Sequence, residues 1–222
     1  MTEALPNWKR VLVVVAHPDD ESFGLGAVIA RLVDDGAEVS VLCLTAGEAS
    51  TLGASPDLAE IRAAELDAAA SALGCRTTAL RTHPDGGLPG REAALIDDIE
   101  VAVDTTRPDG LLAFAVEGGV TGHPDHEAAS RAALTVAADR GLPALEWGLP
   151  DEVAAVLRGE FGAGFTGHAA DALPIVIDVD RARQIQAAHL HVTQAIPGSV
   201  LWRRLELLGT REYLRLTQPD GR

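Results

Sequence analysis

The sequence predicts an α/β protein with a Rossmann-like, mostly parallel sheet and helices on both faces of that sheet. Two observations predict this class. Short apolar runs rich in β-branched residues recur along the chain, and such runs are typical of parallel strands buried on both faces. Most of these runs are followed by a segment with the apolar spacing of a helix, and strands that alternate with helices indicate a layered parallel sheet.

The predicted elements alternate regularly up to about residue 140. Four apolar runs predict strands, the third of them weakly: 11–16, 39–44, 78–80 and 111–115. Four segments with helical spacing predict helices: 25–33, 57–73, 92–105 and 125–138. Gly36 and Gly74 follow the first two helices, as expected of glycine at a helix end. We therefore expect residues 8–140 to form the core of the fold.

The pattern is less regular after Gly141. Residues 142–157 are expected to hold a strand and a loop. Further strands and helices are expected as follows: strands at 175–179 and 212–216, and helices at 180–195 and 202–208. No internal repeat or low-complexity linker divides the chain. We therefore expect one domain over residues 1–222, with the less regular part, 141–222, completing the pocket.

Composition and charge restrict the classes of partner. The chain has 222 residues, 47% of them hydrophobic, which suits one domain with a substantial core. Its formal net charge of −15 repels nucleic acid and anionic lipid, so neither is expected as a partner. No apolar stretch approaches the roughly 20 residues of a membrane span. Cys43 and Cys75 lie outside any Cys-x-x-Cys pair and are interpreted as reduced thiols, which favours a cytoplasmic protein.

A first polar cluster, His17-Pro18-Asp19-Asp20, comes directly after the first predicted strand. In open α/β sheets, ligands bind outside the carboxyl ends of the strands, so this cluster is well placed for chemistry. Adjacent carboxylates repel each other unless a cation or hydrogen-bond donors neutralise them. The cluster therefore indicates a functional site. By contrast, the Gly24-Leu25-Gly26 segment lacks the third glycine of a dinucleotide-binding fingerprint, and we set a nucleotide site aside.

A second cluster, His123-Pro124-Asp125-His126, follows the strand predicted at 111–115 and should reach the same edge of the sheet. A pocket containing His17, Asp20 and His126 offers two nitrogens and one oxygen. That is a usual ligand set for catalytic zinc, which keeps one position free for water. Another divalent transition metal can occupy such a site as well.

The remaining side chains of the two clusters suit the other roles of a hydrolase. A bound zinc ion lowers the pKa of a water molecule towards ~7. Asp19, a carboxylate next to a ligand, is expected to act as general base. His123 is expected to stabilise the oxyanion or to protonate the leaving amine, with Asp125 holding its tautomer and orientation.

The residues Ala16-His17-Pro18-Asp19-Asp20-Glu21 and Gly122-His123-Pro124-Asp125-His126 resemble the two signatures of the PIG-L/LmbE deacetylases. The resemblance implies a Rossmann-like fold and a zinc-dependent enzyme that removes an N-acyl group, in the simplest case N-acetyl, from an N-acetylglucosamine conjugate. It implies zinc ligation by His17, Asp20 and His126. It also implies catalytic roles for Asp19, His123 and Asp125.

Weaker matches to the same family are spread over most of the chain: residues 44–48, Arg62 with Glu65, residues 84–86, and residues 191–194 with threonine in place of serine. Arg62 and Asp85 are accordingly expected to contact the sugar or a polar substituent, although a surface charge and a turn residue are equally compatible with the sequence. Glu48 either faces the pocket or solvent. His83, His168 and His189 are interpreted as surface or structural residues.

Two departures from the family leave the substrate open. Ala27 follows Gly26 where the family often has a second glycine, and residues 141–173 fit the family poorly. An amidase acting on a larger amide is the closest alternative to a small-molecule amino-sugar deacetylase. A metal-dependent phosphoesterase is disfavoured because the two clusters contain no arginine or lysine. A non-catalytic binding protein is disfavoured by the presence of Asp19 and His123. Homo-oligomerisation is left open.

Overall fold

One seven-stranded sheet organises the computed structural model, which describes residues 4–219. Its strands are β1 (Arg10–Val15), β2 (Glu38–Thr45), β3 (Thr77–His83), β4 (Gly110–Phe114), β5 (Ala144–Gly148), β6 (Ile175–Asp178) and β7 (Arg211–Thr217). The strand order is β3-β2-β1-β4-β5-β7-β6. Strands β1 to β5 run parallel, and β7 is antiparallel to both of its neighbours. The predicted mostly parallel sheet is therefore confirmed.

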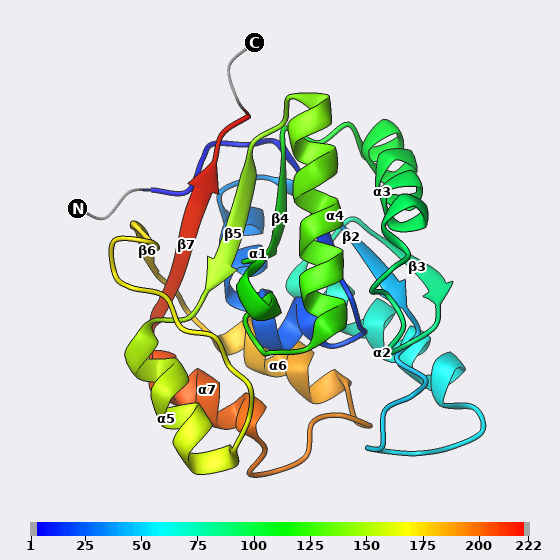
Figure 1. Ribbon diagram of the computed structural model, residues 1–222, viewed down its shortest axis with the longest axis vertical. Coiled ribbons are helices and arrows are strands. Elements are labelled where there is room, and N and C mark those ends of the chain that lie inside the picture. Colours follow the sequence, from blue (N-terminus) through cyan, green and yellow to red (C-terminus); the bar gives the residue numbers. More distant parts are fainter. Residues whose placement is uncertain (1–3, 220–222) are drawn as a thin grey trace.

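Helices cover both faces of this sheet (Figure 1). They are α1 (Gly26–Asp34), α2 (Leu58–Leu73), α3 (Glu92–Thr106), α4 (Pro124–Arg140), α5 (Asp151–Phe161), α6 (Ala182–Leu190) and α7 (Val200–Leu208). Helices α3 and α4 pack on one face, and α1, α2 and α6 on the other. Within residues 4–219, no helix combines the length and the apolarity needed to cross a membrane.

The central strand β1 shows why the sheet is buried on both sides. Successive side chains of a strand point to opposite faces. Val11, Val13 and Val15 accordingly belong to the core beneath α1 and α2, whereas Leu12 and Val14 belong to the core beneath α3 and α4. All five are at most 3% exposed. A continuous apolar run is thus what this strand requires, as its sequence predicted.

The fold places a crevice between β1 and β4. These two strands are neighbours, but the chain leaves β1 towards α1 on one face and leaves β4 towards α4 on the other. Such a reversal of direction at the carboxyl edge of a parallel sheet is where α/β proteins bind ligands. Both polar clusters of the sequence follow these strands. The first lies between β1 and the turn η1 (Asp20–Gly24), and the second comes after the 3₁₀ turn η2 (Glu117–Gly119) that follows β4.

Two predicted elements in the less regular region are wrong. Residues 142–157 were expected to end in a loop, but helix α5 begins at Asp151, where two acidic residues occupy its first turn and favour its N-terminus. Val153 and Leu157 then pack into the core. The helix predicted over 180–195 ends at Leu190, because His191 leaves the helical conformation and turns inward onto Glu21. A tertiary contact overrides the local helical pattern there.

Candidate active site

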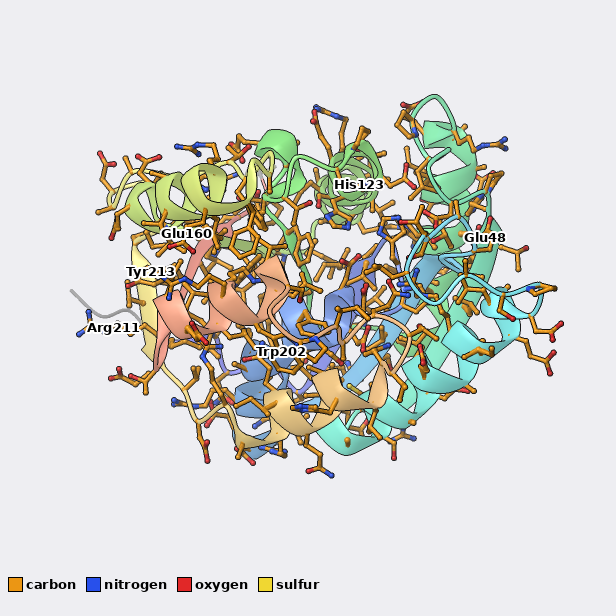
Figure 2. All side chains as sticks on the ribbon, turned by 90° about the horizontal axis from the view of Figure 1, so that it is seen from below. Glu48, His123, Glu160, Trp202, Arg211 and Tyr213 are labelled. Carbon is orange, nitrogen blue, oxygen red and sulfur yellow. The ribbon has the colours of Figure 1, made fainter. Side chains whose placement is uncertain are left out.

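A pocket of about 620 Å³ opens at the carboxyl edge of the parallel strands. Figure 2 looks onto this edge, with His123 at the start of α4, Glu48 on the loop after β2 and Trp202 on α7 arranged around the centre. The pocket is lined from both polar clusters and from the region after residue 160, where the contributing residues are Ala163, Phe165, Gln194, Val200, Leu201 and Arg204. The less regular part of the chain therefore contributes lining residues to the pocket.

The three predicted metal ligands meet at one point of this pocket. His17 Nδ1 lies 3.0 Å from His126 Nε2, and His126 Nε2 lies 3.1 Å from Asp20 Oδ1. Asp20 Oδ2 lies 3.7 Å from His17 Nδ1. All three residues are nearly buried. Two segments more than 100 positions apart in the sequence thus converge as the strand pattern predicted.

The donor atoms of this cluster fit a metal ion. Donors held about 2.0–2.1 Å from a tetrahedral zinc lie roughly 3.3–3.4 Å apart. The two imidazole nitrogens are 3.0 Å apart, and each lies near one oxygen of Asp20: Oδ1 is 3.1 Å from His126 and Oδ2 is 3.7 Å from His17. Burial opposes ionisation of Asp20, but His126 and His17 hold the pKa of its carboxyl below the usual range. The carboxylate is therefore available as an anionic ligand. His17, Asp20 and His126 would hold the ion.

The other ring nitrogen of His17 is held by two carboxylates. Its Nε2 lies 3.0 Å from Asp85 Oδ1 and 3.3 Å from Asp125 Oδ2. Burial lowers the pKa of His17, but the hydrogen bonds to Asp125 and Asp85 outweigh that effect and raise it to about 10. Carboxylates behind a histidine commonly fix the tautomer and orientation of a metal ligand. Nε2 keeps its proton for the two carboxylates, and an ion bound at Nδ1 would take the place of the proton on that nitrogen.

These contacts correct two expected roles. The carboxylate of Asp125 was expected to support His123, but it contacts His17 and accepts hydrogen bonds from the backbone amides of Gly86 and Leu88. Asp85 was expected to contact the sugar. Its side chain instead lies between His17 and the backbone amide of residue 49, which donates to Asp85 Oδ2 at 2.9 Å. Both carboxylates therefore position His17, although Asp85 also lines the pocket.

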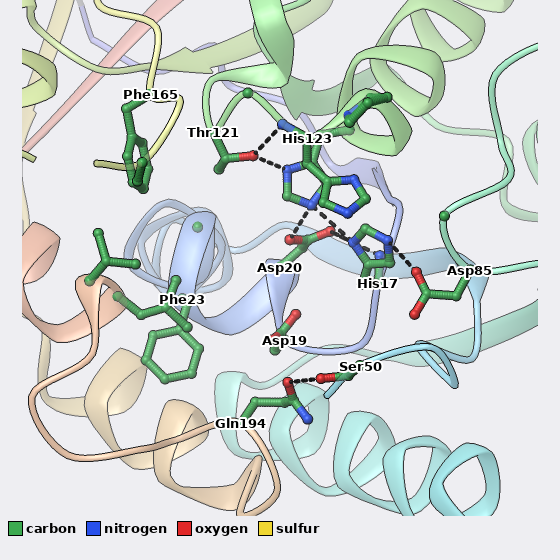
Figure 3. A pocket seen from close by; sticks show the side chains of 18 of the residues that line it. His17, Asp19, Asp20, Phe23, Ser50, Asp85, Thr121, His123, Phe165 and Gln194 are labelled. Atoms are coloured by element: carbon green, nitrogen blue, oxygen red, sulfur yellow. Dashed lines mark hydrogen bonds and ion pairs between the residues drawn. The ribbon is translucent and has the colours of Figure 1, made fainter. Parts of the chain in front are cut away.

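His126 is oriented by a residue that the sequence analysis missed. Its Nδ1 lies 2.6 Å from the hydroxyl of Thr121, which leaves Nε2 facing Asp20 and His17. Thr121 follows η2 and precedes the second polar cluster, in a loop whose sequence carries no signal of its own. Only the folded loop brings this hydroxyl onto the imidazole (Figure 3).

Replacing Thr121 with valine is expected to weaken metal binding about 10- to 100-fold, the usual cost of losing a hydrogen bond behind a metal ligand. Valine keeps the shape of threonine and removes only the hydroxyl that contacts His126. Competition with a metallochromic chelator measures the affinity. Thr135→Val is a matched control, because the hydroxyl of Thr135 bonds within helix α4, to the carbonyl of Arg131. An unchanged affinity in Thr121→Val would remove Thr121 from the site.

Asp19 lies next to the cluster of His17, Asp20 and His126, and its backbone conformation is strained. Its φ of 122° is rare for a residue with a side chain, and such outliers persist only where surrounding contacts hold them. Several hydrogen bonds hold the turn around Asp19. The backbone amide of Asp19 donates to Glu21 Oε2 at 3.0 Å, and Arg62 donates to the carbonyl of Pro18 and, at 2.8 Å, to that of Gly47.

Arg62, which is expected to contact substrate, lines the pocket, and its guanidinium also binds the protein backbone. It is 3% exposed, and both of its terminal nitrogens bind backbone carbonyls, with Nη2 also 3.4 Å from Asp19 Oδ1. Burial raises the pKa of Asp19; Arg62 opposes this and Asp20 adds to it, giving a pKa of about 6. Arg62 therefore positions the backbone around Asp19 and attracts its carboxylate.

A second buried layer secures this turn. Glu21 is fully buried and accepts hydrogen bonds from Ser22 Oγ at 2.5 Å and from His191 Nε2 at 2.6 Å. Thr193, two residues after His191, donates its amide and its hydroxyl to Glu65 on α2, at 2.9 and 2.7 Å. The weak sequence matches at Glu65 and at residues 191–194 therefore belong to one network behind Asp19. Glu21 is a supporting residue that the sequence analysis assigned no role.

His123 begins α4 and is poised as a hydrogen-bond donor. Its Nδ1 accepts the backbone amide of Asp125 at 3.2 Å, so the neutral imidazole carries its proton on Nε2. Burial lowers the pKa of His123, and the charges of His17 and His126 lower it further. A ring nitrogen of His123 also lies within 4.8 Å of ring nitrogens of both other histidines. A neutral donor next to the cluster can stabilise developing negative charge.

The remaining histidines lie outside this pocket, as predicted. His83 contacts Asp98 at 2.8 Å, His168 is buried beside the carbonyl of residue 149, and His189 bonds to the carbonyl of residue 185. Glu48 is exposed and accepts the backbone amide of Asp85.

Gly47 is needed where Arg62 crosses the loop. A Cβ atom at Gly47 would lie 2.2 Å from Arg62 Nη1, and the φ of this glycine is +64°. Gly47→Ala is therefore expected to destabilise the protein by about 1–3 kcal/mol more than Gly141→Ala, since overpacking adds to the strain of a positive φ. Gly141 is the matched control because its φ is +66° and its Cβ would meet nothing within 4 Å. Urea unfolding measures both variants, and equal losses would contradict the contact.

The fold and the cluster define a class: a Rossmann-like α/β protein with a buried two-histidine, one-carboxylate centre at the carboxyl edge of its sheet. Comparison with protein families assigns the chain within that class. Residues 12–137, which include both polar clusters, match the family "PIG-L: GlcNAc-PI de-N-acetylase". The chain belongs to this family.

Comparisons with individual proteins agree with this assignment. A 1D-myo-inositol 2-acetamido-2-deoxy-α-D-glucopyranoside deacetylase of Kineococcus radiotolerans is 38% identical over 69% of this chain, and the match spans only 52% of that relative. The solved structure of the A40926 pseudoaglycone deacetylase Dbv21 is 26% identical, with a TM-score of 0.74 over 96% of this chain and 99% of that one. The same fold also occurs in GalB, a 4-carboxy-2-hydroxymuconate hydratase of Pseudomonas putida KT2440 (18% identity, TM-score 0.69, 96% and 98% covered). The fold alone therefore does not define the reaction.

Proposed function

We propose that this chain is a zinc-dependent N-deacetylase that hydrolyses the N-acetyl group of a small amino-sugar conjugate. The observation that carries the proposal is the convergence of His17, Asp20 and His126 beside an unligated carboxylate, Asp19, and a neutral donor, His123. A centre that only stabilised the fold would require neither of the last two residues. Membership of the family and the named activities of the Kineococcus protein and Dbv21 support the same reaction.

The residues of the chain divide the work of amide hydrolysis. A zinc ion held by His17, Asp20 and His126 supplies Lewis acidity, polarising a carbonyl oxygen and making a water molecule more acidic. Asp19 accepts the proton of the attacking water as general base. His123 donates from Nε2 to the carbonyl oxygen as it becomes negative. The water oxygen forms a bond to the carbonyl carbon, the C–N bond breaks, and the proton taken by Asp19 passes to the leaving nitrogen, which yields acetate and a free amine.

The strained turn around Asp19 supports its role in this reaction. A base must sit within hydrogen-bond reach of the water from which it takes a proton. Arg62 and Glu21 fix the turn from either side, so Asp19 pays no further ordering cost when substrate binds.

One assay tests the proposed reaction. The purified protein, analysed for metal content, is incubated with methyl and inositol glycosides of N-acetylglucosamine, and acetate and free amine are both measured. We expect equimolar release of the two products, its loss on treatment with a chelator, and its return on addition of Zn²⁺. Release of a free amine with a larger acid, and only from bulkier N-acyl substrates, would favour an amidase. Intact amides throughout would overturn the proposal.

A further inference from the structure

The pocket has an apolar half that the proposed reaction does not use. Phe23 and Phe165 lie on one side of the pocket, while Asp85 and the histidine cluster lie on the other (Figure 3). Val200 and Leu201, at the start of α7, line this half as well. An N-acetyl group is too small to need both halves, so the apolar half is available to another part of a substrate.

The wall that carries Phe165 is fixed in place. The amide of Thr166 donates to the carbonyl of Val120 at 2.8 Å, and Arg158 Nη1 donates to the carbonyl of Phe165 at 2.7 Å. Gly122 packs so tightly on Gly164 that a Cβ at Gly122 would lie 2.3 Å from the carbonyl oxygen of Gly164. The segment after α5 is therefore docked against the loop that leads to His123 and His126. A preformed wall binds a ligand without a large ordering cost.

Arg204 on α7 lines this pocket and is only 1% exposed. Within residues 4–219, its guanidinium donates one hydrogen bond, from Nη2 to the carbonyl of Phe23, and it has no carboxylate within 4.0 Å. Its Nε is buried without a partner. The guanidinium lies over the ring of Trp147, 5.2 Å from the centroid, which stabilises a cation without neutralising its charge.

An unpaired buried charge is costly, so its retention in a pocket calls for an explanation. Among residues 4–219, the other buried arginine is Arg62. It lies 3.4 Å from the carboxylate of Asp19, although its Nε also lacks a hydrogen-bond partner. Burial lowers the pKa of Arg204 to about 10, which still leaves it protonated at neutral pH. A cation with vacant donors beside an apolar wall is complementary to an anion on an apolar body.

We propose that Arg204 and the apolar wall of Phe23, Phe165, Val200 and Leu201 form a second subsite, which binds an anionic group on an apolar body. The inference rests on the proposed function in one respect: it assigns this body to the part of the conjugate attached to the amino sugar. A carboxylate is the simplest such anion, because its two oxygens match the guanidinium donors. Arg204 would then select among conjugates that share the same acetylated sugar.

Binding of benzoate to metal-depleted protein tests the subsite without turnover. Benzoate combines an apolar ring with a carboxylate, and benzamide is its neutral counterpart. We expect calorimetry to show benzoate binding at least about 10-fold more tightly than benzamide, the usual size of a charge-assisted contact. Arg204→Met should remove this preference and Arg204→Lys should retain part of it. Equal binding of the two probes to the wild-type protein would overturn the subsite, whatever the stability of the variants.

Arg203→Met is the matched control. Arg203 is the preceding residue of α7, but it faces solvent and pairs with Glu160 and Glu206. It should keep the wild-type preference for benzoate. A loss of preference in Arg203→Met as large as that in Arg204→Met would mean that the charge of α7 in general, and not the pocket, attracts the anion.

A second assay separates the subsite from the deacetylase proposal. Benzyl and 4-carboxybenzyl glycosides of N-acetylglucosamine differ only in the carboxylate of the aglycone. We expect the ratio of their kcat/KM values to favour the carboxylate at least about 10-fold in the wild-type protein and to fall near unity in Arg204→Met. Turnover of both glycosides at equal rates would overturn the subsite alone. Turnover of neither, with benzoate binding intact, would overturn the deacetylase proposal and leave the anion site standing.

Discussion

Asp19→Asn is expected to lower kcat for amide hydrolysis by about 10²–10⁴-fold, the usual contribution of a general base. Asparagine keeps the size of the side chain but cannot accept the proton of the attacking water at neutral pH. The proposed ligand atoms come from His17, Asp20 and His126, so the metal content should not change on this substitution. Steady-state kinetics with a fixed metal content measures the change.

The exposed Asp35 provides the control for this substitution. It pairs only with Arg31 at the surface of α1, so Asp35→Asn should leave kcat unchanged. Loss of metal in Asp19→Asn would mean that this carboxylate is itself a ligand. Unchanged turnover with full metal occupancy would end its assignment as base.

The sequence predicted the parts of the site in which a polar cluster directly follows a buried parallel strand. Strands β1 and β4 read as apolar runs because both faces of each are buried, and each is followed by a polar cluster. The reversal of the chain between two neighbouring parallel strands brings those clusters together, and that rule is general. His17, Asp20 and His126 could therefore be placed in one cluster from the sequence alone.

The roles of residues that orient the site residues could not be predicted in the same way, because these roles depend on loop conformation. Asp125 belongs to the second cluster in sequence, yet its carboxylate faces His17 of the first. Thr121 and Glu21 carry no chemical signal until the loops fold onto the imidazoles and onto the strained turn. The sequence left open whether Arg62 contacts substrate or is a surface charge on an alanine-rich helix. The structure shows that it is buried and that Gly47 packs against its guanidinium.

The apolar half of the pocket illustrates the same limit at a larger scale. It is assembled from the segment after α5 and from the start of α7, two parts of the chain whose patterns are irregular. Neither Phe165 nor Arg204 belongs to a recognisable cluster in the sequence. Phe165 reaches the pocket because the contact between Gly122 and Gly164 docks the segment after α5 against the loop before α4.

His126→Ala is expected to abolish stoichiometric metal binding and, with it, activity. Losing a hydrogen bond behind a ligand costs about 10- to 100-fold in metal affinity, and losing the ligand itself should exceed the upper end of that range. The substitution also removes the two ring nitrogens that lie 2.6 Å from the hydroxyl of Thr121 and 3.1 Å from Asp20 Oδ1. Metal content after gel filtration, measured by mass spectrometry, checks the result.

His189→Ala is the matched control, since His189 lies on α6, where it contacts the carbonyl of Ile185 and the ring of Trp202, and it does not line the pocket. It should retain one metal per chain. If His126→Ala also retained a full equivalent of metal, the ion would have to sit elsewhere. The second group of donors around His17, formed with Asp85 and Asp125, would then be the place to look. The roles assigned to Asp19 and His123 would lose their basis together, because both depend on their distance from His126 and Asp20.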